Sequence, residues 1–149
     1  MLRTSVRVSV VFAGWLMAVV THGALAQKAP ELTRSTTEGI YSAEQAARGE
    51  KTYGMSCLGG CHSATAHKGG PFKETWNGQP LSELFVKIKD LMPDDNPGLL
   101  SPKEAIDVLS YILKLNGLPA GKEELGSDKA TLAKIKIEMP SSVGASQSR

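Results

Sequence analysis

The chain has 149 residues, enough for one small domain with additional segments at its ends. Hydrophobic residues make up 41% and charged residues 21% of the sequence, which excludes a disordered protein and indicates a globular one. The 17 Lys and Arg residues nearly balance the 15 Asp and Glu residues, so a basic surface for binding nucleic acid is not expected.

The first 26 residues have the three parts of a secretory signal peptide. Two arginines supply the basic start, residues 8–20 are almost entirely apolar, and Ala24-Leu25-Ala26 is a small-x-small cleavage site. The apolar run is shorter than the about 20 residues of a membrane span, so an uncleaved anchor is the less favoured alternative. We therefore expect export to the periplasm and a mature chain that starts at Gln27, with 15 basic and 15 acidic residues.

The mature chain is predicted to begin with an extended arm and a helix. Residues 27–40 are polar and have no regular hydrophobic period, which favours irregular backbone. A helix is predicted from Ser42 to about Met55, because Ser42 and Gln45 have capping-box spacing and good helix formers follow. Gly49 costs this helix about 1 kcal/mol relative to alanine, which indicates that another backbone approaches closely there.

This helix leads directly into Cys57-Leu58-Gly59-Gly60-Cys61-His62. Two cysteines followed at once by a histidine are typical of a covalently attached c-type haem. Cys57 and Cys61 would each bond a vinyl group of the porphyrin, and His62 would be the proximal iron ligand. The usual motif has two residues between the cysteines, whereas this chain has three, and the two glycines permit the backbone angles of such a bulge.

Three haem-free interpretations of the cysteines stay open. In an exported protein they would form a disulfide closing a small loop, although this leaves His62 unexplained. A metal-binding module would need Asp or Glu to complete the four ligands of a zinc ion. A thioredoxin-like redox site is disfavoured, because no strand–helix–strand pattern surrounds the cysteines.

After the motif, one loop and one further helix are predicted. Residues 67–77 have no clear period and are expected to be loop, with His67 at the surface as only a secondary candidate for a ligand. A helix from Ser82 to about Leu91 has a single apolar stripe. Met92-Pro93 ends it, since a residue before proline disfavours helical backbone angles.

The third main helix has the clearest boundaries. Ser101 is its N-cap, Pro102 occupies the first helical position and Glu104 completes a capping box. Asn116-Gly117 supplies the C-cap. A short amphipathic helix is predicted over residues 127–136, and no strand is expected anywhere in the chain.

A methionine is the expected sixth ligand of the iron. Met55 is too near the attachment segment to reach the opposite haem face, and Met139 lies in the tail. Met92 lies in a proline-stiffened loop after a helix, so we predict it to be the distal ligand, with packing in the core as its alternative role.

Taken in order, these segments resemble the class I cytochromes c, especially the small cytochromes c associated with quinoprotein dehydrogenases. The matching pieces are Gly39-Ile40-Tyr41-Ser42, Gln45 to Gly49, Cys61-His62, Trp76-Asn77-Gly78, Leu81 to Phe85, Met92-Pro93, Pro97-Gly98, Asp107 to Leu113 and Asn116 to Gly121. The resemblance implies an all-α class I cytochrome c fold, with three main helices and a short C-terminal helix around one haem. The cytochrome domain would cover residues 41–121, followed by an extension over 122–140 and a disordered tail over 141–149.

The resemblance also implies roles for residues outside the attachment motif. Gly49 and Tyr53 would pack against the third helix where the first helix crosses it. The carbonyl of Pro71 would accept the ring N–H of His62 and fix its tautomer. Trp76 would lie near the haem edge or a propionate.

The implied function is one-electron transfer by an exported monohaem cytochrome c that is not an enzyme. Electrons would come from an exported dehydrogenase, such as a quinoprotein, and would pass toward a terminal oxidase. Methionine and histidine as axial ligands favour a relatively high reduction potential. No membrane span is expected in the mature chain. A haem sensor or enzyme is the alternative, and it would need an open iron site.

Overall fold

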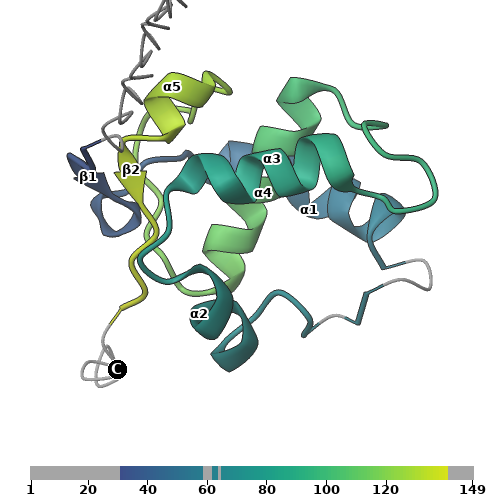
Figure 1. The fold of residues 1–149 in the computed structure, drawn as a ribbon, viewed down its shortest axis with the longest axis horizontal. Coiled ribbons are helices and arrows are strands. Elements are labelled where there is room, and N and C mark those ends of the chain that lie inside the picture. The colour runs from purple at the N-terminus through teal and green to yellow at the C-terminus, as the bar shows by residue number, and fades with distance from the viewer. Residues whose placement is uncertain (1–30, 59–61, 64, 141–149) are drawn as a thin grey trace, which may run out of the picture.

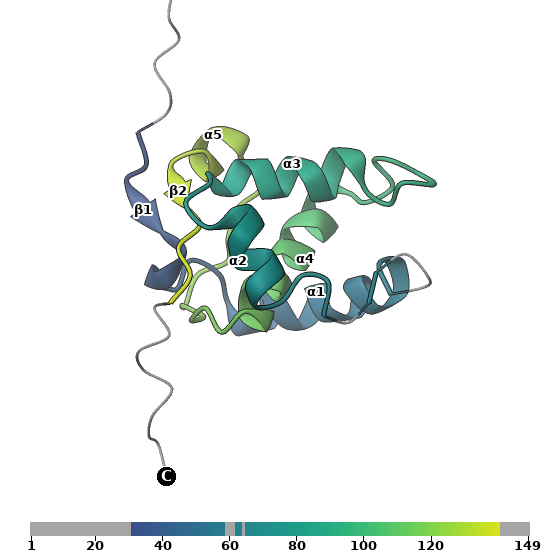
Figure 2. The same cartoon turned by 60° about the horizontal axis from the view of Figure 1, so that its bottom comes forward.

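Two helices that cross near their middles, α1 (Ala43–Ser56) and α4 (Pro102–Leu115), form the centre of the computed structural model, which describes residues 31–58, 62–63 and 65–140. Around them lie α2 (Gly70–Trp76), α3 (Leu81–Leu91) and the one-turn α5 (Lys129–Leu132) (Figure 1). α4 packs against both α1 and α3, and Figure 2 shows it between them. This mostly helical arrangement is consistent with a class I cytochrome c fold around a haem, as predicted. Within the described ranges, no helix is long and apolar enough to cross a membrane.

The crossing of α1 and α4 depends on Gly49. A Cβ atom at this position would fall within 3.0 Å of backbone atoms of Asp107 and Val108, closer than real Cβ atoms come to such neighbours. The predicted close approach of another backbone is therefore confirmed. Beside it, Arg48 binds the buried Asp107 carboxylate through Nε at 2.9 Å and Nη2 at 3.1 Å. Because this ion pair is bidentate, it fixes the orientation of Arg48 relative to α4 beside the close backbone packing.

The helix ends agree with most of the predicted caps. The Ser42 hydroxyl caps α1, and Ser101 and Glu104 form both halves of a capping box at the start of α4. Beyond the C-terminal end of α4, Gly117 has a φ of 75°, the left-handed conformation that glycine adopts without steric cost. These boundaries could be predicted because each cap is made by residues within one turn of the helix end.

Gln45 does not complete the capping box that its spacing predicts. It is buried, and its Nε2 donates to the carbonyl of Leu125 at 2.8 Å while its Oε1 accepts the Leu125 N–H at 2.8 Å. The side chain therefore ties the segment after α4 to α1. The prediction was wrong because the better partners of this amide are 80 residues away in the chain.

Replacing Gln45 by leucine is expected to destabilise the haem-loaded protein by about 1–3 kcal/mol. Both backbone groups of Leu125 would stay buried without a partner, and such groups carry their full desolvation cost. Gln79→Leu, at an exposed glutamine, is the matched control and should change stability by no more than about 0.5 kcal/mol. Urea unfolding measures the stability of both variants. Equal stabilities would contradict the role of the Gln45 side chain in holding the segment after α4 against α1.

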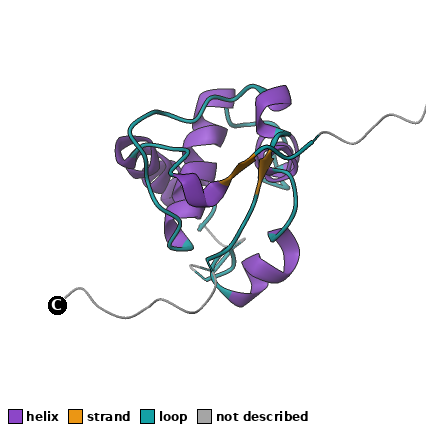
Figure 3. Cartoon of the chain, turned by 90° about the vertical axis from the view of Figure 1, so that its left-hand side faces the viewer, coloured by secondary structure: helices purple, strands orange, loops and turns teal. Residues whose placement is uncertain are grey.

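The segment before α1 is more regular than predicted. β1 (Arg34–Ser35) pairs in parallel with β2 (Ile135–Lys136), side by side in Figure 3, and the 3-10 helix η1 (Thr36–Glu38) follows β1. The buried Thr36 hydroxyl donates to the carbonyl of Glu138 at 3.1 Å and accepts its N–H at 2.9 Å. The predictions that this segment is irregular and that the chain has no strands were wrong. They failed because β2, the partner of β1, comes from the far end of the chain.

Two further elements differ from the prediction. α2 lies within residues 67–77, which were expected to be loop. The helix was not predicted because its Gly-Gly-Pro start is typical of a loop. Pro71 is nevertheless suited to the first helical turn, where no N–H donor is needed, and Phe72 is buried. The helix predicted over 127–136 is shortened to α5, since the chain turns after it into β2. The signal peptide and the tail after residue 140 lie outside the described residues.

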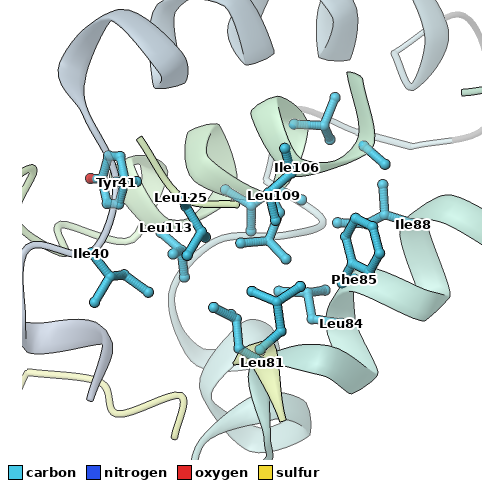
Figure 4. Close-up of a cluster of buried hydrophobic side chains, with 14 of the residues drawn as sticks. Ile40, Tyr41, Leu81, Leu84, Phe85, Ile88, Ile106, Leu109, Leu113 and Leu125 are labelled. Carbon is cyan, nitrogen blue, oxygen red and sulfur yellow. The ribbon is translucent and has the colours of Figure 1, made fainter. Parts of the chain in front are cut away.

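The hydrophobic core lies largely between α3 and α4. In Figure 4 the α3 side chains point toward those of α4, with Ile40, Tyr41 and Leu125 at one side. The apolar stripes predicted for these two helices supply most of the labelled residues, namely Leu84, Phe85, Ile88, Ile106, Leu109 and Leu113. Leu81, one residue before the predicted start of α3, is buried with them, whereas Leu91, predicted as the last residue of the α3 stripe, is exposed because it lies at the end of the helix. Leu132, Ile135 and Ile137, from α5 onward, are fully buried and extend the core.

Candidate functional site

A cavity of about 300 Å³ opens among the helices. It is bounded by the end of α1, by α2, α3 and α4, and by the loops that follow α1 and α3. Its volume is at the lower end of the range usual for small-molecule and cofactor sites. Much of the wall is made of buried apolar side chains, namely Phe72, Leu84, Ile88, Leu100, Val108 and Ile112.

The structure brings the predicted site residues that it describes to this one cavity. Its lining includes Cys57, His62, Pro71, Trp76 and Met92. Cys61 lies outside the described residues. The site is therefore assembled from parts of the chain that are 35 positions apart in sequence, between Cys57 and Met92.

Cys57 and His62 are held by the end of α1. Cys57 is the C-cap residue of that helix, and its N–H donates to the carbonyl of Tyr53 at 2.9 Å. The carbonyl of Cys57 accepts the N–H of His62 at 3.2 Å. This bond joins His62 to the C-cap residue of α1, and His62 lines the cavity.

Met92 reaches the same cavity from another element. It is the C-cap residue of α3, half-buried, in extended backbone with φ −123° and ψ 150°. Pro93 directly after it favours this extended conformation and ends the helix at Leu91, as predicted. A thioether sulfur and an imidazole therefore come from separate loops to one apolar cavity.

Pro71 and Trp76 belong to α2, which the sequence did not reveal. The carbonyl of Pro71 accepts the hydroxyl of Thr75 at 3.0 Å. Trp76 is half-buried and packs against the core. The bond from His62 to Pro71 and the contact of Trp76 with a haem edge stay predictions.

His67 is the residue that the sequence analysis missed. It was expected at the surface, yet it is half-buried and lines the cavity. Its Nδ1 lies 2.9 Å from the hydroxyl oxygen of Tyr53, and its ring centroid lies 4.6 Å from that of His62. No local pattern marks this role, because the polar neighbours of His67 in sequence are typical of a surface loop.

The surroundings keep both members of the Tyr53–His67 pair uncharged at neutral pH. Burial, and then the electrostatic influence of the neighbouring His62 ring, lowers the pKa of His67 below its ordinary value. Burial, followed by the neighbouring Cys57 and Tyr111, raises the pKa of Tyr53. The hydrogen bond between them therefore joins two neutral groups at the edge of the cavity.

Comparison with known families supports one of the possible kinds of site, a haem site, over the haem-free alternatives. Residues 44–112 match the family model described as cytochrome c oxidase, cbb3-type, subunit III. The matched segment runs from α1 to α4, just under half of the chain, and contains Cys57, Cys61, His62 and Met92. The match supports a c-type cytochrome. Comparisons with curated proteins and with solved structures gave no match.

A cytochrome c domain implies covalently bound haem c with its iron. The cavity fits this group, since its walls are largely apolar and it presents an imidazole and a thioether, both of which ligate haem iron in cytochromes c. By contrast, no group of three or more His, Cys, Asp or Glu side chains among residues 31–58, 62–63 and 65–140 could hold a metal ion. The narrower likeness to the cytochromes of quinoprotein dehydrogenases stays a prediction.

Proposed function

We propose that the protein is an exported monohaem cytochrome c that carries electrons one at a time between redox proteins and is not an enzyme. One observation carries the proposal: His62 and Met92 line the same apolar cavity, and Cys57 lies beside them. Cytochrome c domains generally act as electron carriers rather than enzymes, and the family match supports a haem-binding carrier.

Each site residue has a distinct role in this proposal. Cys57 and Cys61 would form the thioether bonds that hold the haem, His62 would be the proximal iron ligand and Met92 the distal one. Haem supplies a one-electron couple between ferrous and ferric iron. The soft thioether of Met92 favours the ferrous state, so it raises the reduction potential. With His62 and Met92 both holding the iron, no position would be left on it for a substrate or a gas.

The apolar walls set the surroundings of this couple. Phe72, Leu84 and Ile88 are buried and line the cavity from α2 and α3, and Val108 lines it from α4. A hydrophobic shell around a metal site controls access of solvent and the local dielectric, and thereby the redox potential. These side chains would keep water from the iron while electrons pass through a haem edge.

Partner proteins would dock at the end of the molecule where α1 ends and where the loop after α3 lies. Figures 1 and 2 both show these two segments at the same end. Large hydrophobic side chains are exposed at this end. Met55 (77% exposed) and Leu58 lie at the end of α1, Leu91 is the last residue of α3, and Leu99 lies in the loop after it. We expect brief contacts burying less than about 1,200 Å², as in other redox encounters.

The route of the electrons is proposed from the sequence. An exported dehydrogenase, such as a quinoprotein, would be the donor, and a terminal oxidase the acceptor. Export to the periplasm with cleavage after Ala26 is proposed from the signal peptide.

Expression of the full chain in a bacterial host with haem-attachment machinery tests the proposal. The denatured mature protein should have the mass of a chain starting at Gln27 plus one haem, and the haem should resist acid–acetone extraction. Cys57→Ala should leave at most one thioether and shift the alkaline pyridine haemochrome spectrum. Ser56→Ala, at a neighbouring residue that also lines the cavity, is the matched control and should leave the spectrum unchanged.

Three outcomes would contradict the proposal in different ways. Complete extraction of haem from the wild type would exclude covalent attachment. A colourless protein with the two cysteines joined would favour the haem-free disulfide module. A mass that retains Met1 would contradict export with cleavage while leaving the carrier function intact.

A further inference from the structure

One side chain in the wall of the cavity differs from its largely apolar surroundings. Lys87 lines the cavity from α3, and it is the one Lys or Arg residue that does so in the described part of the chain. The roles proposed above for the cavity residues do not include it. Apolar cofactor sites contain a small number of polar or charged groups that fix the orientation of the bound molecule. A cation in this wall therefore favours a ligand that carries a negative group.

The register of α3 places Lys87 on the cavity side of the helix. Leu84 and Ile88 line the cavity as well, and residues at positions i, i+3 and i+4 share one face of a helix. Those two side chains are buried, whereas Lys87 is exposed. Long basic side chains bury their aliphatic stems along apolar surface and keep the charged group in water. We therefore expect the stem of Lys87 to follow the cavity wall, with its ammonium group at the margin.

The charge of Lys87 is not neutralised by the protein. Within the described ranges its side chain makes no ion pair, either with Asp94, which also lines the cavity, or with any other acidic residue. The next lysine of the same helix differs in this respect. Lys89 Nζ lies 3.8 Å from Asp90 Oδ1, and Lys89 does not line the cavity. Of these two lysines, only Lys87 is both unneutralised and directed at the cofactor site.

The chemistry of haem c supplies the opposite charge. Its propionate carboxylates lie on the edge of the porphyrin away from the vinyl groups. Cys57 would bond a vinyl group at the end of α1, and Figures 1 and 2 show the start of α3 away from that end. Helical side chains lean toward the N-terminus of their helix, so Lys87 leans in the direction expected for the propionates. Trp76, for which the resemblance implies a contact with a haem edge or a propionate, lines the same cavity as the last residue of α2.

We propose that the Lys87 ammonium group binds a propionate of the haem and thereby fixes the orientation of the ring in the cavity. This inference rests on the proposed function, because it requires a haem attached at Cys57. Lys87 also neutralises part of the negative charge of the propionates. Ferric iron carries one positive charge more than ferrous iron, so a nearby cation disfavours the ferric state. Lys87 therefore raises the reduction potential.

The reduction potentials of haem-loaded variants test this role by changing the charge at one position. Lys87→Gln removes the charge and should shift the equilibrium about threefold toward ferric iron, a fall of about 28 mV for one electron. Lys87→Glu reverses the charge and should shift it about tenfold, a fall of about 59 mV. Lys87→Arg keeps the charge and should keep the wild-type potential.

Lys89→Gln is the matched control, because it removes the same charge from the same helix at a residue that pairs with Asp90 and does not line the cavity. It should shift the potential by less than half as much as Lys87→Gln. Equal shifts in the two variants would overturn the proposal, because they would indicate a general effect of surface charge. An unchanged potential in Lys87→Gln would overturn it as well.

A direct measurement on the wild type keeps the test independent of whether the variants fold. In ¹³C-labelled ferrous protein, the Cε protons of Lys87 should show a nuclear Overhauser effect to the propionate methylene protons of the haem. A red, low-spin wild type without this effect would overturn the binding of a propionate by Lys87 and would leave the proposed carrier function standing. A colourless wild type would overturn the two together.

Discussion

Met92→Ala is expected to open the iron to external ligands and to lower the reduction potential. Met92 lines the cavity from the C-cap of α3, and no other methionine lines that cavity in the described part of the chain. Without the thioether, carbon monoxide should bind the ferrous protein, visible as a shift of its main absorption band. Axial ligands set haem potentials over about 0.8 V, so a fall on the order of 100 mV is expected.

Met55→Ala is the matched control for this prediction. It removes the same side chain from a residue that is 77% exposed at the end of α1. The variant should therefore bind no carbon monoxide and should keep the wild-type potential. If the wild type itself binds carbon monoxide rapidly at neutral pH, Met92 is not a firm ligand. The iron site would then be open, and the sensor or enzyme interpretation would replace that of a carrier.

The three methionines illustrate what the sequence predicts well about the site. Chain distance alone excluded Met55, and the structure places its side chain at the surface. Met139 was set aside as part of a tail, but it is half-buried, packs against the core, and its N–H donates to Asn77 Oδ1 at 2.8 Å. The sequence around Met139 could not predict this contact, because it joins residues 62 positions apart.

The same distinction explains the outcome for the fold. Capping residues and helix-ending prolines act within one turn, so Pro93 predicts the end of α3 correctly, and Ser101 and Glu104 predict the start of α4. The partner of Gln45 is 80 residues away, and that of Thr36 is 102 away. Prediction from neighbouring residues in the sequence therefore fails for side chains whose partners belong to other elements. His67 belongs to this class, since Tyr53 lies on α1, and Asn116, which donates to the His67 carbonyl, lies at the end of α4.

Gly49→Ala should have a large effect for the addition of one methyl group, with a loss of roughly 3 kcal/mol or more in the free energy of unfolding. A Cβ there would fall within 3.0 Å of the Asp107 carbonyl and the Val108 nitrogen, which are backbone atoms that no side-chain rotation moves. Overpacking of a core typically costs about 1–3 kcal/mol even when side chains adjust. Here α1 and α4 themselves must separate. Urea unfolding of the haem-loaded protein measures the loss.

Gly54→Ala is the control, because it adds the same methyl group to the same helix at a position with no neighbour within 4 Å. Alanine is the better helix former, so this variant should gain up to about 1 kcal/mol. Separation of the helices would also move Cys57 and Tyr53, which α1 carries, away from the cavity wall formed by Val108 of α4. Gly49→Ala should therefore also loosen the proposed ligation by Met92, so that carbon monoxide gains access to the ferrous iron although every proposed ligand is still present. Equal stability of the two alanine variants would contradict the close crossing on which the cavity depends.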